Sequence, residues 1–227
     1  MKKIGKFYIL AWNFSYGSES SNRLLAYANS AADMGYDVHI VAFLRLMKRD
    51  CHPKKGVSIK GLLPCRISSG ILSKLVSLFT TIWFLLTEVK KEDRLLLYSS
   101  PEYLFFCLMF KRKQTYFEVT ECPDLFHPRT YPFSYYKKLW KRLKGIFVIS
   151  DNLKQYFVDH GVEPERVHVI NMIVDFSRFE GVKKNPDAEK YIAYCGNVNK
   201  DNKDGVGELI ASFVSRSKIV YHWSYCF

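Results

Sequence analysis

A polar loop follows the first apolar run of the chain and leads into a helical pattern. The loop contains Ser15, Gly17 and Ser18. Backbone N–H groups at a helix N-terminus, together with the helix dipole, suit a phosphate group or sugar hydroxyls. A serine of the same loop, Ser20 or Ser21, could equally cap the helix with its side chain. The loop therefore predicts either a binding loop or an ordinary helix start.

Two carboxylates, Glu121 and Asp124, follow a later strand pattern at residues 115–121. A carboxylate placed at the end of a strand could take a proton from an acceptor hydroxyl, as a general base does. Alternatively, Asp124 caps a turn and Glu121 is a solvated residue at the edge of the sheet. Both residues are candidate catalytic groups, and the residues by themselves leave the two interpretations open.

Apolar runs typical of strands alternate with helical patterns between residues 6 and 171. The expected strands cover residues 6–12, 37–43, 57–63, 94–100, 115–121, 145–150 and 167–171. The expected helices cover residues 22–35, 71–91, 135–143 and 151–160, and another begins at Pro101. This alternation predicts a doubly wound α/β domain, a parallel sheet with helices on both faces and its first strand in the interior. Because ligands bind such sheets beyond the carboxyl ends of the strands, we expect the loop and the two carboxylates at one edge.

The composition indicates a globular, basic protein. The 227 residues include 34 Lys and Arg against 22 Asp and Glu, a formal net charge of +12 at pH 7, which favours contact with phosphates, anionic lipid or nucleic acid. The six cysteines form no C-x-x-C pair and no signal-peptide pattern opens the chain, so a reducing cytosol is the expected location. Cys51 and His52 are the only adjacent Cys and His residues, and one such pair does not predict a metal site. We expect neither a metal nor a cofactor.

The most apolar stretch covers residues 71–87 and contains Lys74. Its uncharged part is too short to span a bilayer, which requires about 20 residues. One interpretation is a helix that packs on the sheet. The other is a helix that lies in the membrane surface with Trp83 at the interface. The bases that flank the stretch are Arg66, Lys74, Lys90 and Lys91.

Two basic regions suggest a different class of function, a binding module for anionic membrane or nucleic acid. One region consists of Arg45, Lys48, Arg49, Lys54 and Lys55. The other covers residues 131–144, where bases alternate with aromatic residues, although its lysines also fit the solvated face of a helix. No specific nucleic acid is expected. Steep salt dependence would mark binding to a phosphate backbone.

A distinctive order of residues occupies positions 145–179, which read GIFVISDNLKQYFVDHGVEPERVHVINMIVDFSRF. This segment resembles the end of the first domain in family 4 (group 1) glycosyltransferases, which have the GT-B fold. Residues 22–43 are similar to the first helix and second strand of that family. Residues 191–213 resemble the opening of its second domain.

The resemblance implies two Rossmann-like domains. Residues 1–171 would form the acceptor-side domain, residues 172–190 a linker, and residues 191–227 the incomplete start of the donor-binding domain. The donor would be a nucleotide-diphosphate sugar, and the acceptor a glycan or a lipid-linked sugar. Gly196 and Lys203 match family positions that contact the donor diphosphate, where a compact ammonium beside a turn would neutralise the leaving phosphate. Asn171 matches the connection between the domains.

The chain ends soon after this resemblance, in the residues SRSKIVYHWSYCF. Members of the family continue with further β-α units, which include two glutamates that hold the donor. We therefore expect a truncated, inactive form of a glycosyltransferase whose full-length relatives act in processes such as surface polysaccharide synthesis. The alternative is the basic binding module. The expected location is cytoplasmic, with peripheral contact at the inner face of the membrane as a further option.

Overall fold

The computed structural model describes residues 4–16, 18–47, 53–63, 71–99, 103–111, 114–123, 133–171 and 181. The chain divides into two units, Met1–Glu180 and Gly181–Phe227. All helices and strands described below belong to the first unit. The predicted linker at 172–190, apart from Gly181, and the predicted start of a second domain at 191–227 lie outside the described residues, as do Gly17, Asp124, Gly196 and Lys203.

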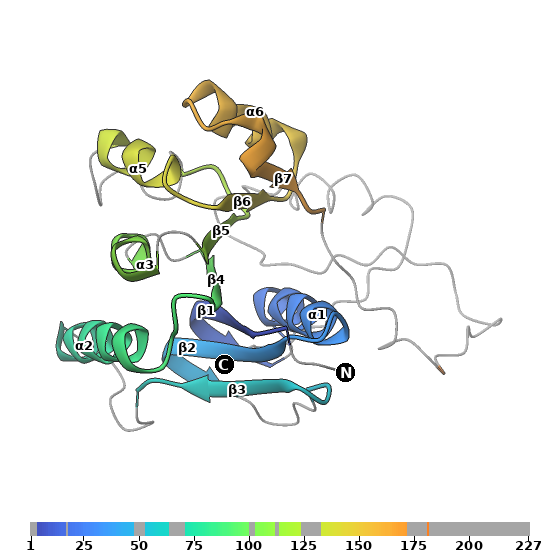
Figure 1. Cartoon of the computed structure of the whole chain (residues 1–227), viewed down its shortest axis with the longest axis vertical. Helices are drawn as coiled ribbons and strands as arrows, with labels where there is room; N and C mark the ends of the chain where they lie inside the picture. Colours follow the sequence, from blue (N-terminus) through green and yellow to red (C-terminus); the bar gives the residue numbers. More distant parts are fainter. Residues whose placement is uncertain are drawn as a thin grey trace, which may run out of the picture. The chain divides into compact units, whose positions relative to one another are not determined.

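The first unit is built on a parallel sheet of seven described strands in the order β3-β2-β1-β4-β5-β6-β7 (Figure 1). The strands are β1 Lys6–Ser15, β2 Asp37–Met47, β3 Val57–Gly61, β4 Arg94–Tyr98, β5 Thr115–Val119, β6 Gly145–Val148 and β7 Val167–Val169. Each neighbouring pair is parallel. The predicted doubly wound, Rossmann-like α/β fold is confirmed, and β1 lies in the interior between β2 and β4, as expected.

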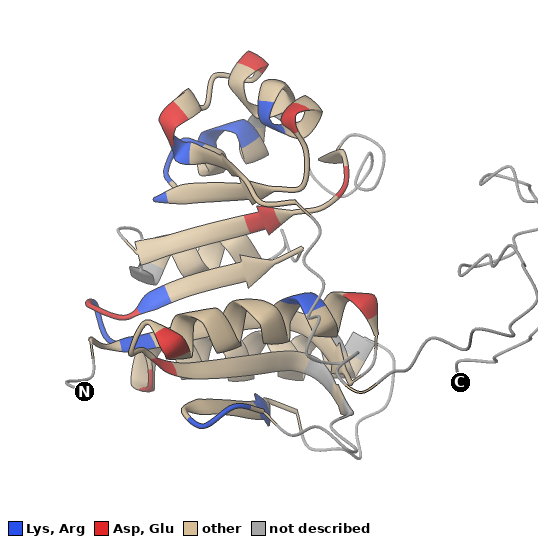
Figure 2. Ribbon diagram, turned by 90° about the vertical axis from the view of Figure 1, so that its right-hand side faces the viewer, with Lys and Arg blue, Asp and Glu red and all other residues tan. Residues whose placement is uncertain are grey.

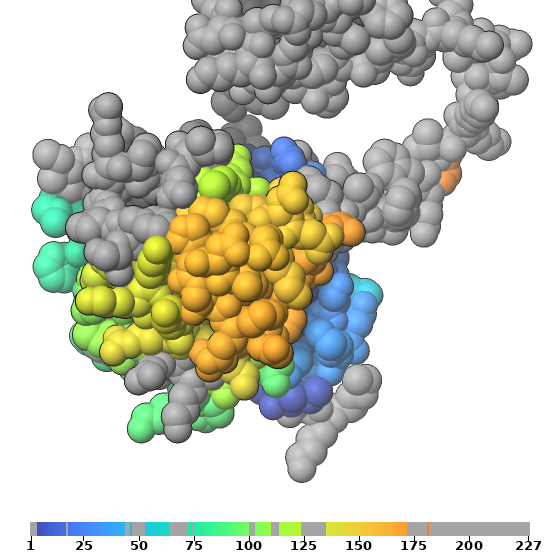
Figure 3. All heavy atoms as spheres, turned by 90° about the horizontal axis from the view of Figure 1, so that it is seen from above, coloured from blue at the N-terminus to red at the C-terminus, as the bar shows by residue number. Residues whose placement is uncertain are grey.

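Helices cover both faces of this sheet. They are α1 Glu19–Asp33, α2 Ile71–Thr87, α3 Leu104–Lys111, α5 Phe133–Trp140 and α6 Asp151–Asp159, with a short 3-10 helix, η3, at Pro164–Arg166. Figure 1 shows α1 on one side of the sheet and α2, α3 and α5 on the other. Seen from above, α5 and α6 lie side by side (Figure 3), and the rings of Trp140 and Phe157 meet with centroids 4.8 Å apart.

The alternation of side chains along β1 divides the core into two clusters. Tyr8 and Leu10 point into the cluster under α2, α3, α5 and α6. Ile9 and Ala11 point into the cluster under α1. All four side chains are almost fully buried, which explains why an interior strand of a parallel sheet reads as a continuous apolar run.

Two boundaries at the start of the chain differ from the prediction. We expected the first strand to end at residue 12, but β1 continues to Ser15 because its pairing with β2 resumes after an irregularity between Ala11 and Asn13. The first helix was expected at 22–35, but α1 begins at Glu19. It ends before Gly35, whose φ of +93° is a left-handed conformation that suits glycine.

Candidate functional site

The direction of the chain connections singles out one place on the sheet. The crossover from β1 to β2 passes through α1 on one face, whereas the crossover from β4 to β5 passes through α3 on the other. The carboxyl ends of β1 and β4 are therefore neighbours whose connections diverge, which is the usual position of ligand sites in open parallel sheets. In Figure 2 the strands run in one direction with α1 in front of them. We call the set of carboxyl strand ends the carboxyl edge.

The serine loop at the end of β1 is closed by its own hydrogen bonds. The backbone N–H of Ser21 donates to Ser18 Oγ (3.3 Å), so Ser18 caps α1. Ser18 Oγ donates to Ser21 Oγ (2.9 Å), and the N–H of Ser15 donates to the same oxygen (2.9 Å). The expected cap by Ser20 or Ser21 was therefore wrong, because α1 begins at Glu19 and the residue before it, Ser18, is the cap. Ser15 and Ser18 lie at the carboxyl edge and form the start of the helix.

Glu121 lies at the same edge, two residues beyond the end of β5. Its side chain is exposed. Because β1 and β5 are parallel strands of one sheet, this exposed carboxylate and the serine loop share the carboxyl edge, as expected from the sequence. Its role as a general base stays a prediction. Asp124, the second candidate carboxylate, lies outside the described residues.

A buried ion pair lies beneath the edge. Glu118, on β5, is fully buried, and Arg23, on α1, is 2% exposed. Arg23 Nε donates to Glu118 Oε1, and the hydroxyl of Tyr27 donates to the same oxygen at 2.8 Å. The other nitrogens of Arg23 donate to the carbonyl oxygens of Ile170 (2.8 Å) and Asn171 (3.0 Å). One guanidinium thus joins α1, β5 and the segment that follows β7.

Burial dominates the electrostatics of this cluster. It raises the pKa of Glu118 in spite of the opposing effects of Arg23 and Tyr27. The pKa of Tyr98, at the end of β4, is raised to about 12 by burial and by the charge of Glu118. The pKa of Tyr27 is raised by the same two causes. Both phenols therefore stay protonated at neutral pH. Glu118 Oε2 has no hydrogen-bond partner among the described residues.

This cluster was not among the sites predicted from the sequence. A signal was present, because Glu118 interrupts the apolar pattern of a strand that must be buried on both faces, and a buried charge requires a partner. Which residue supplies the partner could not be deduced, since Arg23 is 95 residues away in the chain.

Ser99 was also missed. It lies just beyond β4 at the divergence of the connections, it is exposed, and its φ is +43°. This left-handed conformation is uncommon for serine. The N–H of Ser99 donates to the carbonyl oxygen of Glu118 (3.1 Å), which holds the turn in place. Residues in uncommon backbone conformations often occur at functional sites, so Ser99 joins the candidate residues of the edge.

The basic region near residue 50 is only partly described. Lys54 is paired with Asp33, with Nζ at 2.6 and 2.8 Å from the carboxylate oxygens. Lys55 is exposed, whereas Lys48 and Arg49 lie outside the described residues. In the part of the chain that the structure describes, no group of three His, Cys, Asp or Glu residues is arranged to hold a metal ion. No helix there is long and apolar enough to cross a membrane.

Comparisons with known proteins add one likeness. No model of a protein family matches the chain, and no curated protein matches it. Among solved structures, the chain is similar to UGT2 from Phytolacca americana, in complex with UDP-2fluoro-glucose and pterostilbene, with 12% sequence identity and a TM-score of 0.47. The likeness covers 79% of this chain and 57% of that chain, so the chain spans little more than half of its length. It concerns the fold alone.

Proposed function

We propose that this chain carries the acceptor side of a glycosyltransferase that uses a nucleotide-diphosphate sugar, in a process such as surface polysaccharide synthesis. The observation that carries the proposal is the carboxyl edge. The ends of β1 and β4, where the chain connections diverge, lie beside a serine loop and an exposed carboxylate, Glu121. The resemblance of residues 145–179 to family 4 glycosyltransferases supports the same conclusion.

The proposed chemistry uses few groups of the described chain. An acceptor hydroxyl binds at the carboxyl edge, where Glu121 accepts its proton as the hydroxyl oxygen attacks the anomeric carbon of the donor sugar. The bond from that carbon to the diphosphate breaks, and the nucleoside diphosphate leaves. The buried pair of Arg23 and Glu118 does not contact the acceptor. It fixes α1 and the segment after β7 relative to β5, and so positions the residues of the edge.

The donor contacts in this proposal are Gly196 and Lys203. A single lysine in contact with a solvated phosphate contributes on the order of 1 kcal/mol, whereas micromolar affinity requires about 8 kcal/mol. The chain alone should therefore bind no nucleotide sugar with micromolar affinity, and it should not transfer sugar. Isothermal titration with the uridine, guanosine and adenosine diphosphate sugars checks this expectation. Micromolar affinity for any of them would contradict the proposal that this chain supplies only the acceptor side.

Saturation-transfer NMR tests the acceptor side. The probes are free hexoses and N-acetylhexosamines at millimolar concentration, presented to the purified chain. We expect saturation transfer to at least one sugar, a reduced signal in Glu121→Gln, and no change in the control Glu92→Gln. Glu92 is exposed like Glu121 but lies just before β4, at the opposite edge of the sheet. The absence of transfer to every sugar, or an equal loss in both variants, would refute the proposal.

Nucleic-acid binding is distinguished by its salt dependence. If the chain bound a DNA or RNA oligonucleotide through its phosphates, the affinity would fall steeply as salt increases, because bound counterions are released. We expect the sugar signals to be nearly independent of salt, because the sugars carry no charge. Tight, salt-sensitive binding of an oligonucleotide that displaces the sugars would favour the binding module over the glycosyltransferase.

A further inference from the structure

Helix α2 carries large apolar side chains on its exposed face as well as on its buried face, where Phe84 and Leu85 lie among small polar residues. The exposed side chains are between 48% and 70% accessible and lie three or four residues apart, on one face of the helix. They are Leu72, Leu75, Phe79, Trp83 and Leu86. The buried side chains on the sheet side include Ser73, Ser77 and Thr81. A surface helix of a protein surrounded by water normally places polar side chains on its exposed face.

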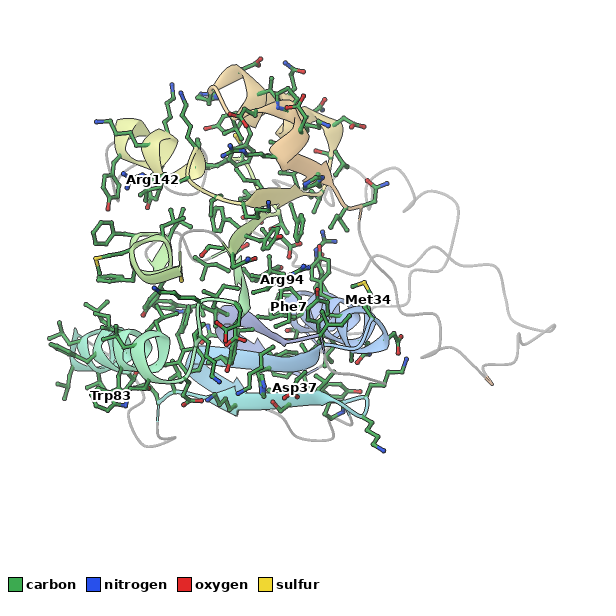
Figure 4. The ribbon with its side chains drawn as sticks, in the orientation of Figure 1. Phe7, Met34, Asp37, Trp83, Arg94 and Arg142 are labelled. Carbon is green, nitrogen blue, oxygen red and sulfur yellow. The ribbon has the colours of Figure 1, made fainter. Side chains whose placement is uncertain are left out.

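The buried hydroxyl of Ser77 is held by the fold. Ser77 Oγ donates to the carbonyl oxygen of Phe43 (3.3 Å) and shares a hydrogen bond with the hydroxyl of Tyr103 (2.8 Å). These contacts fix the rotation of α2 about its axis, so the exposure of its apolar face follows from the packing. Figure 4 shows Trp83 on the side of α2 that points away from the sheet.

The exposed apolar surface continues onto the neighbouring helix α3. Phe105 is 40% exposed and Met109 is 53% exposed. Helices α2 and α3 contact each other, and α3 contacts α5 in turn (Figure 1). We call the seven exposed residues of α2 and α3 the apolar surface. Single exposed apolar residues are normal, but a group of seven on two adjacent helices indicates a binding surface.

Helices α2, α3 and α5, which lie on the same face of the sheet, contain basic residues but no acidic residues. The sequences of α2, α3 and α5 contain Lys74, Lys111, Lys137 and Lys138 but neither Asp nor Glu. Exposed Lys141, Arg142 and Lys144 follow α5. Acidic residues of this layer occur in α6 and after α2, where Glu88 is paired with Lys60 and Glu92 is exposed. On the other face, acidic residues lie at both ends of α1 (Figure 2). An apolar surface next to bases matches acyl chains beneath anionic headgroups.

We propose that the face formed by α2, α3 and α5 docks on the surface of a lipid bilayer that contains anionic lipid. The apolar face of α2 lies in the interfacial region, Trp83 sits at the level of the headgroups, and the bases of α5 contact the phosphates. Helix α2 begins at the carboxyl edge, because it follows the end of β3. This inference does not depend on the proposed glycosyltransferase activity.

The charge distribution favours a bilayer over a second copy of the chain. In a symmetric dimer the same patch meets itself, so both contacting surfaces would carry the bases of this layer. Such a dimer would have to overcome like-charge repulsion. Anionic headgroups neutralise the same bases.

Vesicle co-sedimentation tests the proposal. We expect the chain to bind vesicles of phosphatidylcholine and phosphatidylglycerol, and to bind phosphatidylcholine alone much more weakly. The double variant Phe79→Ser/Trp83→Ser should bind at least tenfold more weakly, because it removes two large interfacial side chains. Its matched control is Met34→Ser, since Met34 is 59% exposed and follows α1 (Figure 4). Lys138→Glu/Lys141→Glu should weaken binding by about tenfold or more, whereas Lys55→Glu should not.

Three further measurements separate the possible outcomes. Lipids brominated along the acyl chain should quench the tryptophan emission of the bound protein, and Trp83→Phe should lose most of this quenching while it still binds. All substituted residues are exposed, so circular dichroism should show unchanged folding. Equal binding by the wild type and the Phe79→Ser/Trp83→Ser variant would overturn the proposal. The proposal would also be overturned if sedimentation equilibrium showed a dimer without lipid that the Phe79→Ser/Trp83→Ser variant, and no other variant, fails to form. The apolar surface would then bind a second copy of the chain.

Discussion

Replacing Arg23 with methionine should destabilise the first unit by roughly 3–5 kcal/mol at neutral pH, the usual cost when one partner of a buried ion pair is removed. Glu118 is fully buried and would keep Tyr27 as a donor but lose its counter-charge. The carbonyl oxygens of Ile170 and Asn171 would each lose a hydrogen bond. Methionine retains most of the apolar stem of arginine, so loss of packing contributes little.

The loss should depend on pH. The pKa of Glu118 is already raised in the folded protein, so the fold favours the protonated carboxyl more than the unfolded chain does. The stability linked to this group is fully present below its unfolded pKa and is lost as pH rises through its folded pKa. Removing Arg23 raises the folded pKa further. The variant should therefore lose least at about pH 5 and most at about pH 7.5.

Urea unfolding followed by circular dichroism, at both pH values, measures this effect. The double variant Arg23→Met/Glu118→Gln removes the buried charge and should recover a large part of the loss at the higher pH. It should not recover all of it, because the two carbonyl oxygens still lack their donor. The prediction is wrong if Arg23→Met lowers the free energy of unfolding by under about 1 kcal/mol, equally at both pH values. The pair would then contribute no more than an exposed salt bridge.

Two further predictions concern stability. Ser18→Ala should destabilise the domain by about 1 kcal/mol in urea unfolding, because α1 loses its cap. The control Ser30→Ala, an exposed change inside the same helix, should be neutral or slightly stabilising. Equal effects of the two substitutions would show that the cap is unimportant. Burial is the main reason that the pKa of His39 is lowered from 6.5 in the folded protein. The stability that comes from its neutral form is therefore present above pH 6.5 and is lost as pH falls. His39→Gln should flatten the pH dependence of the melting temperature on the acidic side of that value, and an unchanged slope would contradict this assignment.

The alternation of strands and helices could be predicted because it depends on local patterns. A strand such as β1 is a continuous apolar run, and its interior position follows from burial on both faces. The end of β1 at Ser15 could not be predicted, because it depends on renewed pairing with β2, a contact between distant segments. The predicted length of the first strand was wrong for this reason. The predicted start of α1 was wrong because Ser18 caps the helix.

The candidate site was predictable only in its location. Parallel strands place every residue that follows a strand at one edge, so Glu121 and the serine loop could be assigned to the carboxyl edge. The partnership of Arg23 with Glu118 depends on tertiary packing. The left-handed backbone of Ser99 depends on a hydrogen bond to β5. Residues 71–87 were expected either to pack on the sheet or to lie in a membrane surface. Helix α2 contacts β2 of the sheet, and the burial of Ser77 and Thr81 shows which face of the helix points outward.

The most direct test of the account is to map sugar binding onto the backbone by amide chemical shifts. The probes are the same hexoses and N-acetylhexosamines, added at millimolar concentration to the isotopically labelled chain. We expect the shifted amides to cluster at the carboxyl edge, around Ser15, Ser18, Ser99 and Glu121. Shifts that cluster instead at the amino edge, around Gly35 and Glu92, or that are absent with every sugar, would contradict the claim that the carboxyl edge is the binding site.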